Sequence, residues 1–123
     1  MLYKKLEDQI NRYNDSGLWF LFDQESHPIC LKDRILGFEI LLAFTSPTKL
    51  QNYIDATGAT GKFGNLMMFG PLRGDQIILF MEEVARKGQD AIAVNVDPVS
   101  LQYEDLLVCS RRAQNLSTRI QLN

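Results

Sequence analysis

The pattern of apolar and polar residues divides the chain into helices and strands. Apolar residues spaced by three and four positions are typical of helices lying on a core, and short uncharged runs are typical of buried strands. We predict helices over residues 2–14, 46–57, 75–87 and 102–114, and strands over residues 18–22, 28–31, 38–44, 66–69 and 91–96. This order predicts an α/β fold of the α+β variant, with helices packed on a mixed β-sheet.

The clearest signal is the apolar run from Ile40 to Phe44, which leads directly into Ser46 and Pro47. A run of this kind predicts a strand buried on both faces. A serine oxygen can cap the first turn of a helix, and proline at the first helical position has no N–H to lose. We expect the strands around Leu42 and Val94 to lie side by side inside the sheet.

Three connections carry further predictions. Residues 28–31 are expected to pair back antiparallel on the strand 18–22 as a β-hairpin, after a short polar turn. Five glycines between Gly58 and Gly74 predict a loop, a short strand and another turn. Asp75 is expected to cap the helix that follows them.

Length and composition indicate one folded domain over residues 1–123. Apolar residues make up 46% of the chain and charged residues 23%, as in ordinary globular proteins. The net charge of −2 argues against nucleic acid as a partner, and no apolar run approaches the roughly 20 residues that a membrane helix needs. We expect a cytoplasmic protein in which Cys30 and Cys109 are reduced thiols.

The motifs that could carry chemistry are weak. The glycine-rich segment before Gly64 contains Gly61-Lys62 but lacks the serine or threonine of a phosphate-binding loop. His27 lies in a predicted turn without a nucleophile at a recognisable spacing. Cys109, followed by two arginines, leaves a sulfurtransferase-like activity open as a less favoured alternative. We therefore predict no catalytic residue, no metal site and no cofactor.

Two classes of function remain. The first is a non-catalytic interaction or regulatory module, with a homodimer as one form of it. Its contact surface would be Leu79 and Phe80, which extend beyond the apolar stripe of their helix, or an open edge of the sheet. The alternative is a protein or enzyme that binds an amino acid or an anionic metabolite where strands end beside helix starts. The polar groups available there are Thr45, Ser46, Asn95 and Asp97.

Three segments also resemble the SseB-type domain, the N-terminal domain of bacterial enhanced serine sensitivity proteins. They are Leu41 to Pro47 with Leu50, Pro71 to Asp75, and Gly88 to Asn95. The resemblance covers roughly residues 18–115, and it departs from the family pattern after Asn95, where Val96 and Asp97 precede the proline. It implies an α/β domain with an interaction or regulatory role in the cytoplasm, and it implies no active-site residues.

Overall fold

The computed structural model describes residues 2–32 and 37–113, which form a single mixed α+β domain. Along the chain the elements are α1 (Leu2–Asn11), β1 (Leu18–Phe22), β2 (Cys30–Lys32), β3 (Glu39–Phe44), α2 (Pro47–Thr57), α3 (Ala59–Phe63), β4 (Met67–Leu72), α4 (Asp75–Arg86), β5 (Ala91–Val94) and β6 (Asp105–Val108). The sheet has six strands in the order β4-β1-β3-β5-β6, and β2 pairs with β3. The predicted fold class is confirmed.

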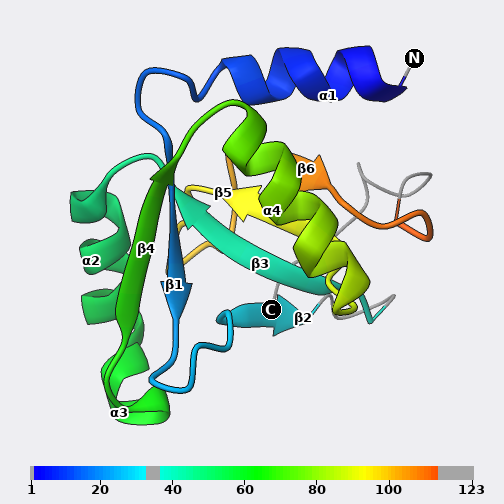
Figure 1. Ribbon diagram of the computed structural model, residues 1–123. Helices are drawn as coiled ribbons and strands as arrows, with labels where there is room; N and C mark the ends of the chain where they lie inside the picture. The colour runs from blue at the N-terminus through cyan, green and yellow to red at the C-terminus, as the bar shows by residue number, and fades with distance from the viewer. Residues whose placement is uncertain (1, 33–36, 114–123) are drawn as a thin grey trace.

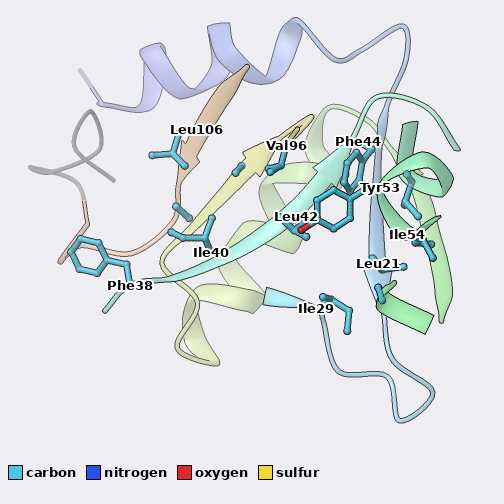
Figure 2. Close-up of a cluster of buried hydrophobic side chains, with 14 of the residues drawn as sticks. Leu21, Ile29, Phe38, Ile40, Leu42, Phe44, Tyr53, Ile54, Val96 and Leu106 are labelled. Carbon is cyan, nitrogen blue, oxygen red and sulfur yellow. The ribbon is translucent and has the colours of Figure 1, made fainter. Parts of the chain in front are cut away.

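Helices cover both faces of this sheet (Figure 1). Side chains from α2 and α3 pack on one face, and side chains from α1 and α4 pack on the other. Figure 2 shows the first of these two cores, where the Tyr53 ring of α2 lies beside Phe44 of β3 with the ring centroids 5.4 Å apart. The molecule is therefore a three-layer arrangement with an apolar core on each side of the sheet.

The centre of the sheet is the parallel pair of β3 and β5, in which Leu42 lies opposite Ala93 and Ala43 lies opposite Val94. Every residue of β5 and five of the six residues of β3 are buried. Because side chains alternate along a strand, Leu42 and Phe44 enter the core under α2 while Ala43 enters the opposite core. The predicted neighbourhood of the two buried strands is confirmed.

The helix predicted after β3 also forms as expected. The Ser46 side chain accepts a hydrogen bond from the Lys49 N–H, Pro47 begins α2, and Gly58 ends it in the left-handed conformation with φ of 66°. Glycine tolerates this backbone because it has no Cβ to clash. Local sequence alone thus determines both ends of α2.

The predicted hairpin is only partly formed. The chain turns back at an isolated bridge between Phe22 and Pro28, but the ladder of β2 runs along β3, with Cys30 opposite Leu41. Pro28 has no N–H to continue a ladder with β1. In addition, β1 pairs with β3 only near Phe44, so the other half of the same β3 edge is available to β2.

The helix predicted over residues 102–114 is wrong for the part that the structure describes. Residues Asp105–Val108 form β6, which pairs antiparallel with β5. The consecutive residues Leu106 and Leu107 are both buried, one in each core, which a strand achieves and one face of a helix does not. Residue 114 lies outside the described residues.

The glycine-rich stretch is more ordered than its sequence predicts. It contains the short helix α3 and the edge strand β4, which pairs antiparallel with β1. Gly70 lies at an irregularity in this pairing, and a Cβ on it would come within 2.6 Å of the Leu18 carbonyl oxygen. Asp75 is the first residue of α4 and its cap is Gly74, so the predicted capping role of Asp75 is wrong.

Asp90, just before β5, joins three segments of the chain. Its side chain is 2% exposed and accepts hydrogen bonds from the Glu39 N–H at 2.9 Å, from Ser110 Oγ at 2.6 Å and from Arg112 Nε at 2.7 Å. Burial by itself raises the pKa of Asp90, but the hydrogen bonds from Arg112, Ser110 and Glu39 outweigh it and lower the pKa below its ordinary value of 3.8. A buried carboxylate with these partners stabilises the start of the central strands.

We expect Asp90→Asn to reduce the free energy of unfolding by about 2–3 kcal/mol, because it removes the charge that pairs with Arg112 and replaces one acceptor oxygen of this buried side chain by a donor. Urea unfolding followed by circular dichroism measures this loss. The exposed carboxylate Asp55, which contacts Gln51 on α2, provides the matched control. Asp55→Asn should cost less than about 0.5 kcal/mol, as surface substitutions do, and equal losses in the two variants would contradict the assignment.

The same carboxylate predicts a pH dependence. Because the pKa of Asp90 is lowered in the folded state, its contribution to stability is present above the unfolded-state value of 3.8 and is lost as the pH falls through the folded-state pKa. The stability difference between wild type and Asp90→Asn should be constant from pH 7 to about pH 5 and should shrink below about pH 4. A difference that grows on acidification would refute this.

Candidate functional site

The strand ends that we predicted as a ligand site form a corner of internal hydrogen bonds. Asn95, directly after β5, has a left-handed backbone with φ of 55°. Its Oδ1 accepts from the Thr45 N–H at 3.0 Å, and its Nδ2 donates to Thr45 Oγ1 at 3.0 Å and to Glu104 Oε2 at 2.8 Å. The side chains of Thr45 and Asn95 are thus brought together as predicted, with their polar atoms bonded to each other.

The other two predicted ligand residues each serve their own loop. Ser46 caps α2, with its Oγ accepting from the Lys49 N–H at 3.1 Å. Asp97 accepts from the backbone N–H groups of Val99 and Ser100 at 2.8 and 3.0 Å, and these hydrogen bonds lower its pKa. Sequence analysis treats both side chains as available binding groups, but in the structure each stabilises its own loop.

A shallow hollow of about 230 Å³ lies beside this corner. Its charged and amide lining residues are Lys49, Asn52, Asn95, Asp97 and Glu104, so two of the predicted ligand residues line it. The Lys49 ammonium lies 3.9 Å from the Glu104 carboxylate. Because these two charges already face each other at the surface, the hollow offers no uncompensated charge to an ionic ligand from this pair.

The two thiols are protonated groups packed against the sheet. Burial, followed by the charge of the nearby Asp90 carboxylate, raises the pKa of Cys109 to about 12. Burial, followed by the charge of Glu39, likewise raises the pKa of Cys30 to about 12. A nucleophilic cysteine needs a stabilised thiolate, and the surroundings of both sulfurs disfavour one.

His27 lies in the turn after β1, with its side chain 71% exposed. Its Nδ1 is 3.6 Å from an Asp23 oxygen and 3.7 Å from a Glu25 oxygen. Within residues 2–32 and 37–113, no three histidine, cysteine or acidic side chains are grouped so that they could hold a metal ion. In the same residues, no helix is long and apolar enough to cross a membrane.

The most unusual surface of the molecule is on the edge strand β4. Three consecutive residues there, Met67, Met68 and Phe69, are 43%, 41% and 47% exposed. Met67 lies opposite Phe22 and Phe69 opposite Phe20 in the β1–β4 ladder, so both point to the face covered by α4, while Met68 points to the other face. The edge strand therefore presents apolar side chains on both of its faces.

Aromatic rings extend this surface from β4 to β1 and α4. The Phe69 ring centroid lies 5.7 Å from that of Phe22 and 6.2 Å from that of Phe80. Phe80 in turn lies 4.4 Å from Phe20, which is fully buried. We call the surface formed by Phe22, Met67, Met68, Phe69 and Phe80 the edge patch.

The two residues predicted as an interface, Leu79 and Phe80, do not share a surface. Phe80 belongs to the edge patch, whereas Leu79 is 65% exposed and lies among exposed polar residues of α4 such as Gln76 and Glu83. Consecutive residues on a helix point about 100° apart, which accounts for the separation. The sequence identifies one member of the edge patch on α4 and misses the three exposed residues of β4.

A cleft of about 270 Å³ continues the edge patch between β1 and α4. Phe22, Phe80 and Val84 supply its apolar walls, and His27 and Lys87 are among the polar residues that line it. Its volume suits one large side chain better than an extended ligand. The cleft therefore adds a recess to an apolar surface, which is typical of protein contact sites.

A scan against models of protein families, a search among curated proteins and a search among solved structures each find no match to this chain. The resemblance to the SseB-type domain therefore stays a prediction. The function must be argued from the surface and the residues themselves.

The hydrogen bonds and the left-handed backbone of Asn95 predict how its substitutions change stability. Asn95→Gly should lose the side-chain hydrogen bonds but keep the left-handed backbone, at a cost of about 1–2 kcal/mol in the free energy of unfolding. Asn95→Ala should cost about 1 kcal/mol more, because alanine is strained at positive φ. Urea unfolding of both variants checks the order, and an alanine variant as stable as the glycine variant would contradict it.

Proposed function

We propose that this chain is a non-catalytic protein-interaction module and that the edge patch is its contact surface. The observation that carries the proposal is the row of Met67, Met68 and Phe69, each more than two-fifths exposed on a strand at the end of the sheet. Natural edge strands are usually protected by charged residues or by covering segments. An uncharged apolar edge is instead typical of a surface that another chain covers.

The composition of the edge patch supports the same conclusion. Methionine and phenylalanine are enriched in the buried centres of protein interfaces, where charged residues are depleted. From Gly64 to Leu72 the sequence contains no ionisable residue. The side chain of methionine also adapts its shape to a partner, because it is unbranched and polarisable.

The hydrogen-bonded polar groups at the ends of the central strands support a non-catalytic role. Asp90, Thr45 and Asn95 are each engaged in hydrogen bonds that fix the fold. The thiols of Cys30 and Cys109 have raised pKa values, so both are protonated at neutral pH. Asp90, Thr45, Asn95 and the two thiols thus each have a structural explanation from their own surroundings.

The proposal places the protein in the cytoplasm, with a protein partner and without nucleic acid. Two free cysteines fit a reducing compartment, where disulfides are rare. The net charge of −2 supplies no general attraction to phosphates. An interaction or regulatory role is also what the resemblance to the SseB-type domain implies.

Phe69→Asp tests the proposal, because it places a charge at the centre of the edge patch. Tagged wild-type protein and variant are expressed in the source cells, and the size of the species that contains each is measured by size-exclusion chromatography of fresh extract. We expect the wild type in a complex larger than one chain, and at least a tenfold smaller share of the variant in that complex.

The control is Leu79→Asp, which places the same charge at an exposed apolar residue outside the edge patch. It should leave the complex intact. Circular dichroism of the purified variants checks that both fold. A wild type that elutes as a single chain, or a complex that survives Phe69→Asp, would overturn the proposed function.

A further inference from the structure

The direction of the backbone groups on β4 follows from the hydrogen bonds of β1. The Leu21 carbonyl accepts from the Ile29 N–H at 2.9 Å, and the Asp23 N–H donates to the His27 carbonyl at 2.8 Å. Both groups point away from β4. In an antiparallel ladder alternate residues point to opposite sides, so Phe20 and Phe22 direct their N–H and C=O groups toward β4.

The register then fixes which residue of β4 faces outward. Phe20 pairs with Phe69 and Phe22 with Met67, so these are the hydrogen-bonded pairs. Leu21 lies opposite Met68 in a pair without hydrogen bonds. The N–H and C=O of Met68 therefore point away from β1, toward the side of β4 on which no described strand lies.

We infer that the edge patch binds a second copy of this chain, by antiparallel pairing of the two β4 strands around a two-fold axis between the two Met68 residues. The inference rests on the proposed function and names its partner. In this register each Met68 donates its N–H to the Met68 carbonyl of the other copy. The two sheets join into one continuous sheet across the axis.

The register uses every exposed apolar residue of the edge. Because the two-fold axis passes between the two Met68 residues, Met67 of each copy lies opposite Phe69 of the other, and this pair occurs twice. These pairs lie on the face covered by α4, and the two Met68 side chains meet on the opposite face. Contacts between methionine sulfur and an aromatic ring are favourable. A parallel arrangement would not give this exchange of Met67 and Phe69.

The absence of charged residues in the sequence around the axis favours a second copy. A two-fold axis brings each residue near it against its own duplicate or a close neighbour of it, so any charge there would meet a like charge. The nine residues from Gly64 to Leu72 carry none. The absence of the lysine or other charge that commonly protects an edge strand is thus the feature that this self-pairing requires.

The size of the surface predicts how tight the dimer is. With about 200 Å² for a large side chain, the three exposed residues of β4 offer on the order of 250 Å² per copy. This is well below the roughly 800 Å² per partner of standard stable interfaces. We therefore expect a dimer that forms and dissociates with protein concentration.

Sedimentation equilibrium of the purified full-length chain, between about 1 μM and 1 mM, tests the inference. The average mass of the wild type should rise with concentration toward twice the monomer mass. Met68→Lys places two ammonium groups at the axis and should weaken the dimer at least tenfold. Leu79→Lys, the same change at an exposed residue of α4, should have no effect, and circular dichroism checks that both variants fold.

Two more variants test the register. Met68→Cys should form an intermolecular disulfide under mild oxidation, because the paired Cα atoms lie about 5.5 Å apart, within the range that a disulfide spans. Leu79→Cys and wild type should not. Met68→Pro removes the outward N–H and no hydrogen bond to β1, so it should also give a monomer that retains its fold.

The outcomes separate this inference from the proposed function. A wild type that stays monomeric up to 1 mM overturns the second copy as partner. In that case, a complex in extract that is lost in Phe69→Asp still supports the proposed function, with a different protein as the occupant. A dimer that resists Met68→Lys and is lost in Leu79→Lys also overturns the inference, because the contact would then lie on α4.

Discussion

The parallel pairing of β3 and β5 is the constraint on which the rest of the structure depends. Apart from Glu39 at the start of β3, both strands are apolar and buried on both faces, so each face of the sheet must be covered by helices. The chain meets this requirement with α2 and α3 on one side and α1 and α4 on the other. Asp90 supports the pair at its beginning through a hydrogen bond from Glu39, the first residue of β3, and Asn95 supports it at its end through a hydrogen bond from Thr45, directly after β3.

This arrangement protects the centre of the sheet better than its edges. The edge at β6 is partly covered by α1 and the turn after it, since Gln9 Nε2 of α1 donates to Asp105 at 3.0 Å and Tyr13 Oη of the turn donates to an Asp105 oxygen at 2.7 Å. The edge at β4 is less covered: Phe80 of α4 contacts Phe69, but Met67, Met68 and Phe69 each remain more than two-fifths exposed. The exposure of the edge patch is therefore a consequence of the layer arrangement, because the helices of the described residues pack chiefly on the middle of the six-stranded sheet.

The elements that sequence analysis predicted correctly are those whose signals are local. The cap at Ser46, the αL residue Gly58 and the uncharged run before Phe44 each need only their neighbours in the chain. The errors occur where tertiary contacts decide. Leu106 and Leu107 lie at a spacing that fits a helix as well as a strand, and the free edge of β5 selects the strand. For the candidate site, sequence analysis names Thr45 and Asn95 as polar groups at neighbouring strand ends. It cannot show that their side chains form hydrogen bonds with each other.

The exposed residues of β4 cannot be identified from the sequence, because nothing in it shows that this strand lies at the edge of the sheet. In sequence, Leu66 to Phe69 is a short apolar run among glycines, and such a run is equally consistent with a buried strand. Only the order of strands shows that its outer side is open. The direction of the Met68 backbone groups follows from the turn after β1, a distant part of the sequence. There the Leu21 carbonyl and the Asp23 N–H form hydrogen bonds with residues 27–29. The outward direction of the Met68 backbone groups is thus a property of the folded sheet, arising from residues that carry no functional motif.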